Sequence, residues 1–237
     1  MRSRPLSRPQ HDSWQTAPVT NQPTTGPDGA TDVRAEITAA MQSITHIFVG
    51  SEFDDAVLIE VRDQMQQIDA ALTAASHGPL QRDFASFFSD DEREAVGTAS
   101  DGSPFGAFND SPVTGDHNPM SYGLNIHLDD GTARATMTLG RAFEGAPGRA
   151  HGGMVAAAFD EVMGLIAPSL GTAAFTAWLK VDYLAPCPLH EELTFTASLS
   201  ERDGRKITVS ATATDAAGET FATAQGLFVA PRRPDAD

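Results

Sequence analysis

Cysteine, lysine and long apolar runs are nearly absent from this sequence, and each shortage excludes a class of protein. The single cysteine, Cys187, rules out an internal disulfide and a zinc-finger type of metal site, and nothing indicates an oxidising compartment. Lys180 and Lys206 are the only lysines, and the net charge of -16 argues against nucleic-acid binding as the main activity. No apolar run reaches the ~18 residues that a membrane span requires. No apolar segment follows the N-terminal arginines, so we expect no secretory signal and a soluble, cytoplasmic protein.

Composition divides the chain into five segments. Residues 1–30 are rich in Pro, Ser, Thr, Gln and Gly, and we predict a disordered tail because they cannot bury enough apolar surface to offset the entropy of ordering. Residues 31–78 are predicted as a helical extension, 79–120 as an irregular connecting segment, 121–230 as the main domain and 231–237 as a polar tail. The connecting segment is interpreted either as a functional loop or as partly disordered.

Two amphipathic helices are predicted within the helical extension. Apolar residues recur three or four positions apart on both sides of an interruption at Gly50 and Ser51, which is the spacing of one helix face. The helices are antiparallel if the interruption is a turn, and they either cover one end of a sheet or cap a ligand channel. The apolar positions are Val33, Ile37, Met41, Ile44 and Phe48, followed by Phe53, Val57, Val61, Met65, Ile68 and Leu72.

Beyond residue 121 the apolar period becomes two, which is typical of strands with one buried face. Two strands joined by a turn at residues 129–131 precede an apolar helix, and four strands with short connections follow it. Short connections make neighbouring strands antiparallel, and the sheet must cover the helix. The predicted fold is therefore α+β, an antiparallel sheet wrapped around one long central helix. Such a sheet exposes an edge, which favours a dimer that continues it.

The central helix begins at His151-Gly152-Gly153 and carries the acidic pair Asp160-Glu161. A carboxylate on a buried helix is costly unless it is paired or functional, and adjacent side chains point about 100° apart, so one can face solvent and the other a cavity. The first helical turn offers free N–H groups at the positive end of the dipole, and glycine there lets a ligand approach closely. An oxyanion site beside a carboxylate suits acyl transfer or hydrolysis. The competing interpretation is a tight turn followed by a surface acid.

These motifs, in this order, resemble the hotdog-fold acyl-CoA thioesterases of the PaaI-like, phenylacetate-pathway type. The resemblance covers residues of about 105–230 and leaves the first 100 residues outside it. Four stretches carry the resemblance. The first is His151-Gly152-Gly153 with Asp160 nine residues after the His, and the second is Thr176 to Tyr183, closing with Pro186-Cys187-Pro188-Leu189, which resembles the family's central strand. The third, Asp203-Gly204-Arg205-Lys206, resembles the turn after the next strand, and the fourth, Gly218 to Phe228, resembles the closing strand.

The resemblance implies roles for individual residues. Asp160 would act as general base on a water or as nucleophile on the thioester carbonyl, and this choice stays open. The backbone N–H of Gly152, with that of Gly153, would hold the carbonyl oxygen. His151 would orient the thioester or the loop, and Thr176 would position the water or Asp160. In similar enzymes the glycine and the carboxylate of one site come from different subunits, so a homodimer would be required for activity; pairing of dimers into a homotetramer is left open.

The family's loop before the His often holds an Asn or Gln that contacts the substrate or the water. Residues 143–150 contain neither, so Asn118 or Glu144 would have to take that role. No cofactor and no metal are implied, because coenzyme A enters as part of the acyl-CoA substrate.

Three basic residues cluster in this strongly acidic chain, namely Arg202, Arg205 and Lys206. Arg and Lys bind phosphates through charge-assisted hydrogen bonds, so the cluster is a candidate site for the phosphates of coenzyme A. The alternative is a solvated turn without a ligand.

Other functions compete with the thioesterase interpretation. A non-catalytic hotdog dimer that binds acyl-CoA or an acyl carrier would keep the pocket and the basic cluster but would not need Asp160. Hotdog dehydratases have a catalytic Asp and His close together at the helix start, an arrangement this sequence lacks. A serine hydrolase is disfavoured because no Gly-x-Ser-x-Gly motif is present.

Overall fold

The computed structural model describes residues 32–78 and 110–232. The predictions of a disordered tail at residues 1–30 and of an irregular segment before residue 110 lie outside the described residues. So does most of the predicted polar tail at residues 231–237. Within the described ranges, no helix combines the length and apolar character needed to cross a membrane.

A six-stranded antiparallel sheet forms the main domain, with the strand order β1-β2-β4-β5-β6-β3. The order follows from short hairpins that join β1 to β2, β4 to β5 and β5 to β6, whereas β3 follows the helices and pairs with β6. The predicted architecture, an antiparallel sheet wrapped around one helix, is confirmed. The strands are β1 Asn125–Asp129, β2 Thr132–Thr138, β3 Phe175–Tyr183, β4 Glu192–Asp203, β5 Lys206–Thr214 and β6 Thr220–Val229.

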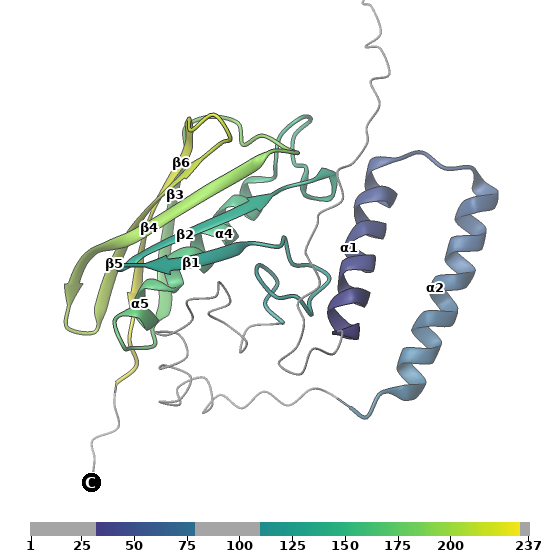
Figure 1. Cartoon of the computed structure of the whole chain (residues 1–237), viewed down its shortest axis with the longest axis horizontal. Helices are drawn as coiled ribbons and strands as arrows, with labels where there is room; N and C mark the ends of the chain where they lie inside the picture. Colours follow the sequence, from purple (N-terminus) through teal and green to yellow (C-terminus); the bar gives the residue numbers. More distant parts are fainter. Residues whose placement is uncertain (1–31, 79–109, 233–237) are drawn as a thin grey trace, which may run out of the picture.

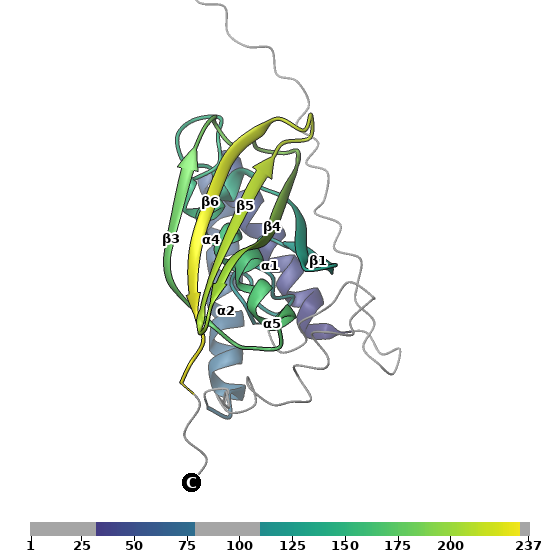
Figure 2. The same ribbon diagram turned by 90° about the vertical axis from the view of Figure 1, so that its left-hand side faces the viewer.

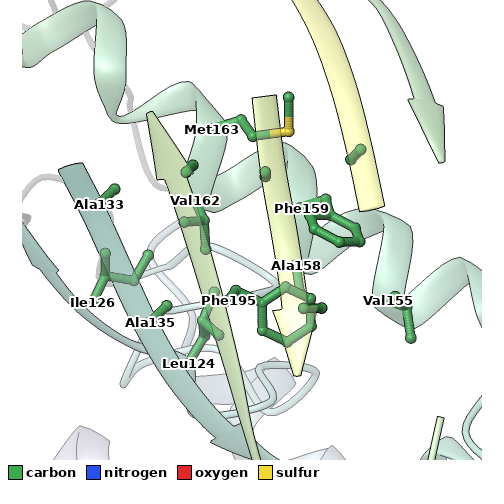
Figure 3. Close-up of a cluster of buried hydrophobic side chains, with 14 of the residues drawn as sticks. Leu124, Ile126, Ala133, Ala135, Val155, Ala158, Phe159, Val162, Met163 and Phe195 are labelled. Atoms are coloured by element: carbon green, nitrogen blue, oxygen red, sulfur yellow. The ribbon is translucent and has the colours of Figure 1, made fainter. Parts of the chain in front are cut away.

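The helix α4 (Gly152–Gly164) lies across the sheet and contributes buried side chains to the core (Figure 1). The short helix α5 (Ile166–Ser169) follows it. Five α4 side chains are buried against the strands, at the three- and four-residue spacing of one face (Figure 3). Phe159 meets Phe195 of β4 edge to face, with ring centroids 5.1 Å apart, and Phe195 meets Phe221 of β6 at 6.2 Å. These contacts fix the height and rotation of α4 over the sheet. The five buried residues are Val155, Ala158, Phe159, Val162 and Met163.

The strand β3 lies at an edge of the sheet (Figure 2). It differs from the other long strands because none of its side chains is fully buried, and only Leu179 and Val181 are partly buried against the core. The inner strands alternate buried and exposed side chains over much of their length, as a sheet with one covered face requires. Trp178 and Tyr183 of β3 are instead 43% and 52% exposed. The strand that resembles the family's central strand is therefore an edge of this chain's sheet.

The helical extension forms two antiparallel helices, α1 (Val33–Gly50) and α2 (Asp55–Ala75), as predicted (Figure 1). Asp32 caps α1, because its carboxylate accepts hydrogen bonds from the N–H groups of Arg34 and Ala35. The rings of Phe48 and Phe53 stack across the turn, with centroids 6.3 Å apart. We call this pair of helices the hairpin.

Helix α1 contacts the main domain through its polar face. Thr38 is buried, Gln42 donates a hydrogen bond to the carbonyl of Ser121 at 3.1 Å, and His46 accepts one from the N–H of Ala142 at 3.2 Å. The imidazole of His46 also packs edge to face on Phe143 at 5.2 Å. The apolar stripe that predicted the helix consequently faces away from the domain.

Candidate active site

The loop before α4 is held in one conformation by hydrogen bonds of its own backbone. The 3-10 helix η3 (Arg141–Phe143) begins it, and the carbonyl of Phe143 accepts a hydrogen bond from the N–H of His151 at 2.8 Å. The carboxylate of Glu144 accepts from the N–H of Gly148 at 2.6 Å and from Arg141, and these two contacts lower its pKa. Both contacts of Glu144 lie within the loop, so in a single chain this residue stabilises the loop's conformation.

His151 and the two glycines form a corner at the start of α4, but their N–H groups are not equivalent. His151 caps the helix, because its Nδ1 accepts from the N–H of Gly153 at 3.0 Å. Within the described residues, the N–H of Gly152 has no such acceptor. The N–H that the chain leaves open for a ligand is therefore that of Gly152.

Tyr183, at the end of β3, covers this corner and was missed by the sequence analysis. Its hydroxyl donates a hydrogen bond to the carbonyl of Gly152 at 2.7 Å. A Cβ on Gly152 would lie 3.3 Å from Cζ and Oη of the same ring, so a larger residue there requires the ring or the corner to shift by a few tenths of an ångström. The signal in the sequence was weak, since Tyr183 appeared there only as the last residue of the stretch Thr176 to Tyr183 that resembles the family's central strand.

Asp160 and Thr176 are brought together by α4 and β3. The hydroxyl of Thr176 donates a hydrogen bond to Oδ1 of Asp160 at 2.8 Å. The pairing of β3 with β6 shifts register between Thr176 and Trp178, a bulge of the kind that re-aims side chains beside functional sites. The carboxylate is half-buried, so it keeps one side fixed by Thr176 while the other can meet a ligand.

Glu161, the neighbouring acid, points elsewhere. It accepts hydrogen bonds from the hydroxyl of Ser111 at 3.0 Å and from that of Thr114 at 2.8 Å. Both donors belong to the loop that leads into β1, so Glu161 anchors that loop to α4. The two carboxylates thus separate as their positions on a helix require: Glu161 binds the loop, and Asp160 faces the edge strand.

Gly152 and Asp160 are not brought together within one chain. They are eight residues apart on the same helix, and at 1.5 Å per residue this separates them by about 12 Å along its axis. A thioester carbonyl held at the N–H of Gly152 would therefore lie out of reach of the carboxylate of the same chain.

The basic candidates Arg202, Arg205 and Lys206 lie at one end of the sheet. Lys206 pairs with Val229, which also pairs with Phe175, so the basic turn shares the Asp160–Thr176 end of the domain. All three basic residues are exposed, and Arg205 also donates a hydrogen bond to the carbonyl of Ala230 at 2.7 Å.

Asn118 holds its own loop rather than an open position. Its side-chain amide donates to the carbonyl of Asp110 at 2.9 Å, and its side-chain carbonyl accepts from the N–H of Met120 at 2.9 Å. Both polar ends of the amide are therefore in use within the chain.

Cys187 is buried, and burial raises the pKa of its thiol to about 12. The thiol stays protonated at neutral pH and is unsuited to be a nucleophile. Cys187 therefore acts as a packing residue of the core.

A family model described as Thioesterase superfamily matches residues 147–222. The acyl-coenzyme A thioesterase THEM4 of Rattus norvegicus is 36% identical over 91 residues, which are 38% of this chain and 39% of the rat protein. The same enzyme of Mus musculus is 36% identical over 98 residues, or 40% of this chain and 42% of the mouse protein. The chain thus spans about two fifths of the length of the curated relatives it matches.

A solved structure shares the fold over most of this chain. A crystal structure of a thioesterase superfamily protein aligns with a TM-score of 0.68 and 29% identity, covering 83% of this chain and 94% of that chain. The E. coli PaaI protein aligns with a TM-score of 0.45 and 23% identity over 47% of this chain and 81% of that chain. The resemblance to hotdog-fold thioesterases and the predicted fold class are confirmed.

Proposed function

Residues 147–222 match the thioesterase superfamily, and from this premise we propose that the chain hydrolyses an acyl-CoA thioester to the free acid and coenzyme A. The thioester-hydrolase class follows from the family, and acyl-CoA as substrate is supported by the names of the rodent relatives. The observation that carries the proposal is the Asp160–Thr176 hydrogen bond of 2.8 Å beside an exposed edge strand. This hydrogen bond fixes the Asp160 carboxylate at the β3 edge of the sheet, where a second subunit would place the unbonded N–H of its Gly152.

We propose that the active unit is a homodimer joined edge to edge at β3. Antiparallel pairing of β3 with its own copy sets the Tyr183 end of one strand against the Thr176 end of the other. The first end carries Gly152 and the second carries Asp160. A dimer of this kind brings together the two groups that one chain keeps about 12 Å apart, and it makes β3 a central strand.

Two chemical routes remain open for Asp160. As a general base it would take a proton from water, whose oxygen attacks the thioester carbonyl; as a nucleophile it would attack the carbonyl itself and form an anhydride that water then hydrolyses. In both, the N–H of the partner subunit's Gly152 would stabilise the oxyanion, and the C–S bond breaks with release of the thiolate, which takes a proton to become free coenzyme A. A single turnover in ¹⁸O-water identifies the nucleophilic route if ¹⁸O appears in Asp160, because the general-base route places ¹⁸O only in the product acid.

Arg202 and Lys206 are the candidates for binding the phosphates of coenzyme A. Both side chains are exposed at the Asp160 end of the sheet, and no acidic partner is bonded to either in the described residues. Arg205 is a weaker candidate, because it donates to the carbonyl of Ala230.

The substitution Asp160→Asn tests the proposal with acyl-CoAs of short, long and aromatic chains, and release of free thiol is the assay. We expect a loss of ~10²–10⁴-fold, the usual contribution of a catalytic base. Asp130→Asn is the matched control, because Asp130 lies in an exposed turn at φ 43°, which Asn also adopts. Full activity of Asp160→Asn would contradict the mechanism, and tight acyl-CoA binding without turnover by the unmodified chain would favour the non-catalytic alternative.

A further inference from the structure

Each helix of the hairpin exposes large apolar side chains that the domain does not cover. In α1 these residues project away from the domain, because the opposite face carries the contacts of Thr38, Gln42 and His46. In α2 they recur at the spacing of a single helix face. Their exposed fractions run from 39% to 63%. We call this set the hairpin face: Val33, Ile37, Met41, Ile44, Phe48, Val57, Met65, Ile68 and Leu72.

The orientation of α1 is fixed, so a small rotation cannot bury the hairpin face against its own domain. His117 contacts Asp32 at 2.7 Å at the start of the helix, and Gln42 bonds the carbonyl of Ser121 at its middle. Near its end, His46 fits so closely on Gly140 that a Cβ there would lie 2.8 Å from the imidazole. Turning the apolar face inward would break all of these polar contacts.

The area of the hairpin face matches that of a protein interface. At these exposed fractions its nine side chains present roughly 900 Å² to solvent, above the ~300–600 Å² of the largest patch on an ordinary monomer. A stable interface buries about 800 Å² on each partner. The hairpin face is therefore large enough to form one side of a dimer.

Charge argues against a lipid surface as the occupant. Residues 32–78 contain eight acidic and two basic residues, and anionic membrane surfaces attract basic segments instead. Protein is the favoured occupant, and the same chain carries a second exposed apolar region on β3, where Trp178 is 43% exposed and Leu184, just beyond, 62%. An isologous interface brings the same surfaces of two copies together, so a second copy offers matching apolar surface.

We propose that the hairpin face docks against a second copy of this chain. The extension then belongs to the dimer interface and adds apolar contact area to the edge-to-edge pairing of β3. This role is independent of the chemistry at Asp160.

Charge substitution on α2 tests the interface in the full-length chain. Ile68→Glu with Leu72→Glu places charges on the hairpin face, whereas Gln66→Glu with Gln67→Glu adds the same charge to positions that project away from it. Fluorescence-detected sedimentation then measures the dimer dissociation constant. We expect an increase of about 100-fold or more for the first pair and a change within about two-fold for the control. Equal constants for the two pairs would overturn the proposal.

A second measurement does not depend on a charged variant remaining folded. A photo-crosslinking amino acid replaces Ile68 in an equimolar mixture of ¹⁴N- and ¹⁵N-labelled chains, and mass spectrometry identifies each linked pair. Links between a light and a heavy chain support docking on a second copy. Links within one chain only, or a chain that sediments as a monomer, would show that the hairpin face has another occupant or none. Thioester hydrolysis by the same samples is scored separately, so failure of the interface and failure of the enzymatic proposal are distinguishable.

Discussion

Replacing Gly152 with alanine tests whether the corner at the start of α4 must stay open. The new Cβ would lie 3.3 Å from Cζ and Oη of Tyr183, several tenths of an ångström inside an ordinary contact. The ring or the corner has to move, and the 2.7 Å hydrogen bond between Tyr183 and the carbonyl of Gly152 is displaced with it. Because misplacing reacting groups by about 1 Å costs ~10²-fold, this shift of a few tenths of an ångström should lower kcat/KM several-fold, up to roughly 10-fold.

Gly164→Ala is the matched control, since it makes the same change on the same helix. Its Cβ would meet only Phe228, at an ordinary 3.9 Å. Both substitutions favour the helix by up to about 1 kcal/mol, so neither should lower the melting temperature much. The assay is thiol release at saturating and limiting acyl-CoA, together with thermal unfolding. Equal activity of the two variants would refute a role for the Gly152 corner, and a melting temperature that falls with the activity of Gly152→Ala would assign the effect to folding.

Three further predictions follow from single contacts. Thr176→Val removes the hydroxyl that donates a hydrogen bond to Asp160 at 2.8 Å and should lower kcat about 10-fold. Thr176→Ser keeps the hydroxyl and should retain most of the activity in steady-state kinetics. An equal loss of kcat in both variants would contradict a hydrogen-bonding role. Cys187, with a thiol pKa of about 12, should resist iodoacetamide at pH 8 until the chain is unfolded, and rapid labelling of the native protein would contradict its burial. Burial lowers the pKa of His46, with His190 as a lesser cause, so the undocked helix takes up a proton first and docking weakens as the pH falls below the ordinary His value. The protection factors of the α1 amides, which are corrected for the slower intrinsic exchange at low pH, should therefore fall when the pH is lowered from 7 to 5. His46→Gln, which keeps an acceptor for the N–H of Ala142, should remove that fall. Unchanged protection factors in the unsubstituted chain would contradict the prediction.

The strands and helices could be predicted from the sequence because their apolar periods reflect local burial. The alternation beyond residue 121 located the strands of the sheet, and the His151-Gly152 corner gave the start of α4. The same reasoning could not separate the duties of Asp160 and Glu161. That division depends on Ser111 and Thr114, which are about fifty residues away in sequence and reach Glu161 only in the folded chain.

The hairpin shows the limit of periodicity more clearly. An apolar stripe predicts a helix, yet α1 uses Gln42 and His46, on its other face, to contact the domain. These contacts are hydrogen bonds to backbone groups, which leave no trace in a hydrophobic pattern. Tyr183 was missed for a related reason, because its partner is the carbonyl of Gly152 and not a side chain.

The shared site is the central claim, and complementation between two inactive variants tests it most directly. Asp160→Asn and Gly152→Val are each expected to be inactive as homodimers. In a mixed dimer, the Asp160 of the Gly152→Val chain faces the intact Gly152 of its partner, so one of the two sites is restored. With random pairing of co-expressed chains, half of the dimers are mixed, and we predict about a quarter of the unsubstituted activity. Activity no higher than that of either parent, with mixed dimers demonstrated by mass, would contradict a site built from two chains.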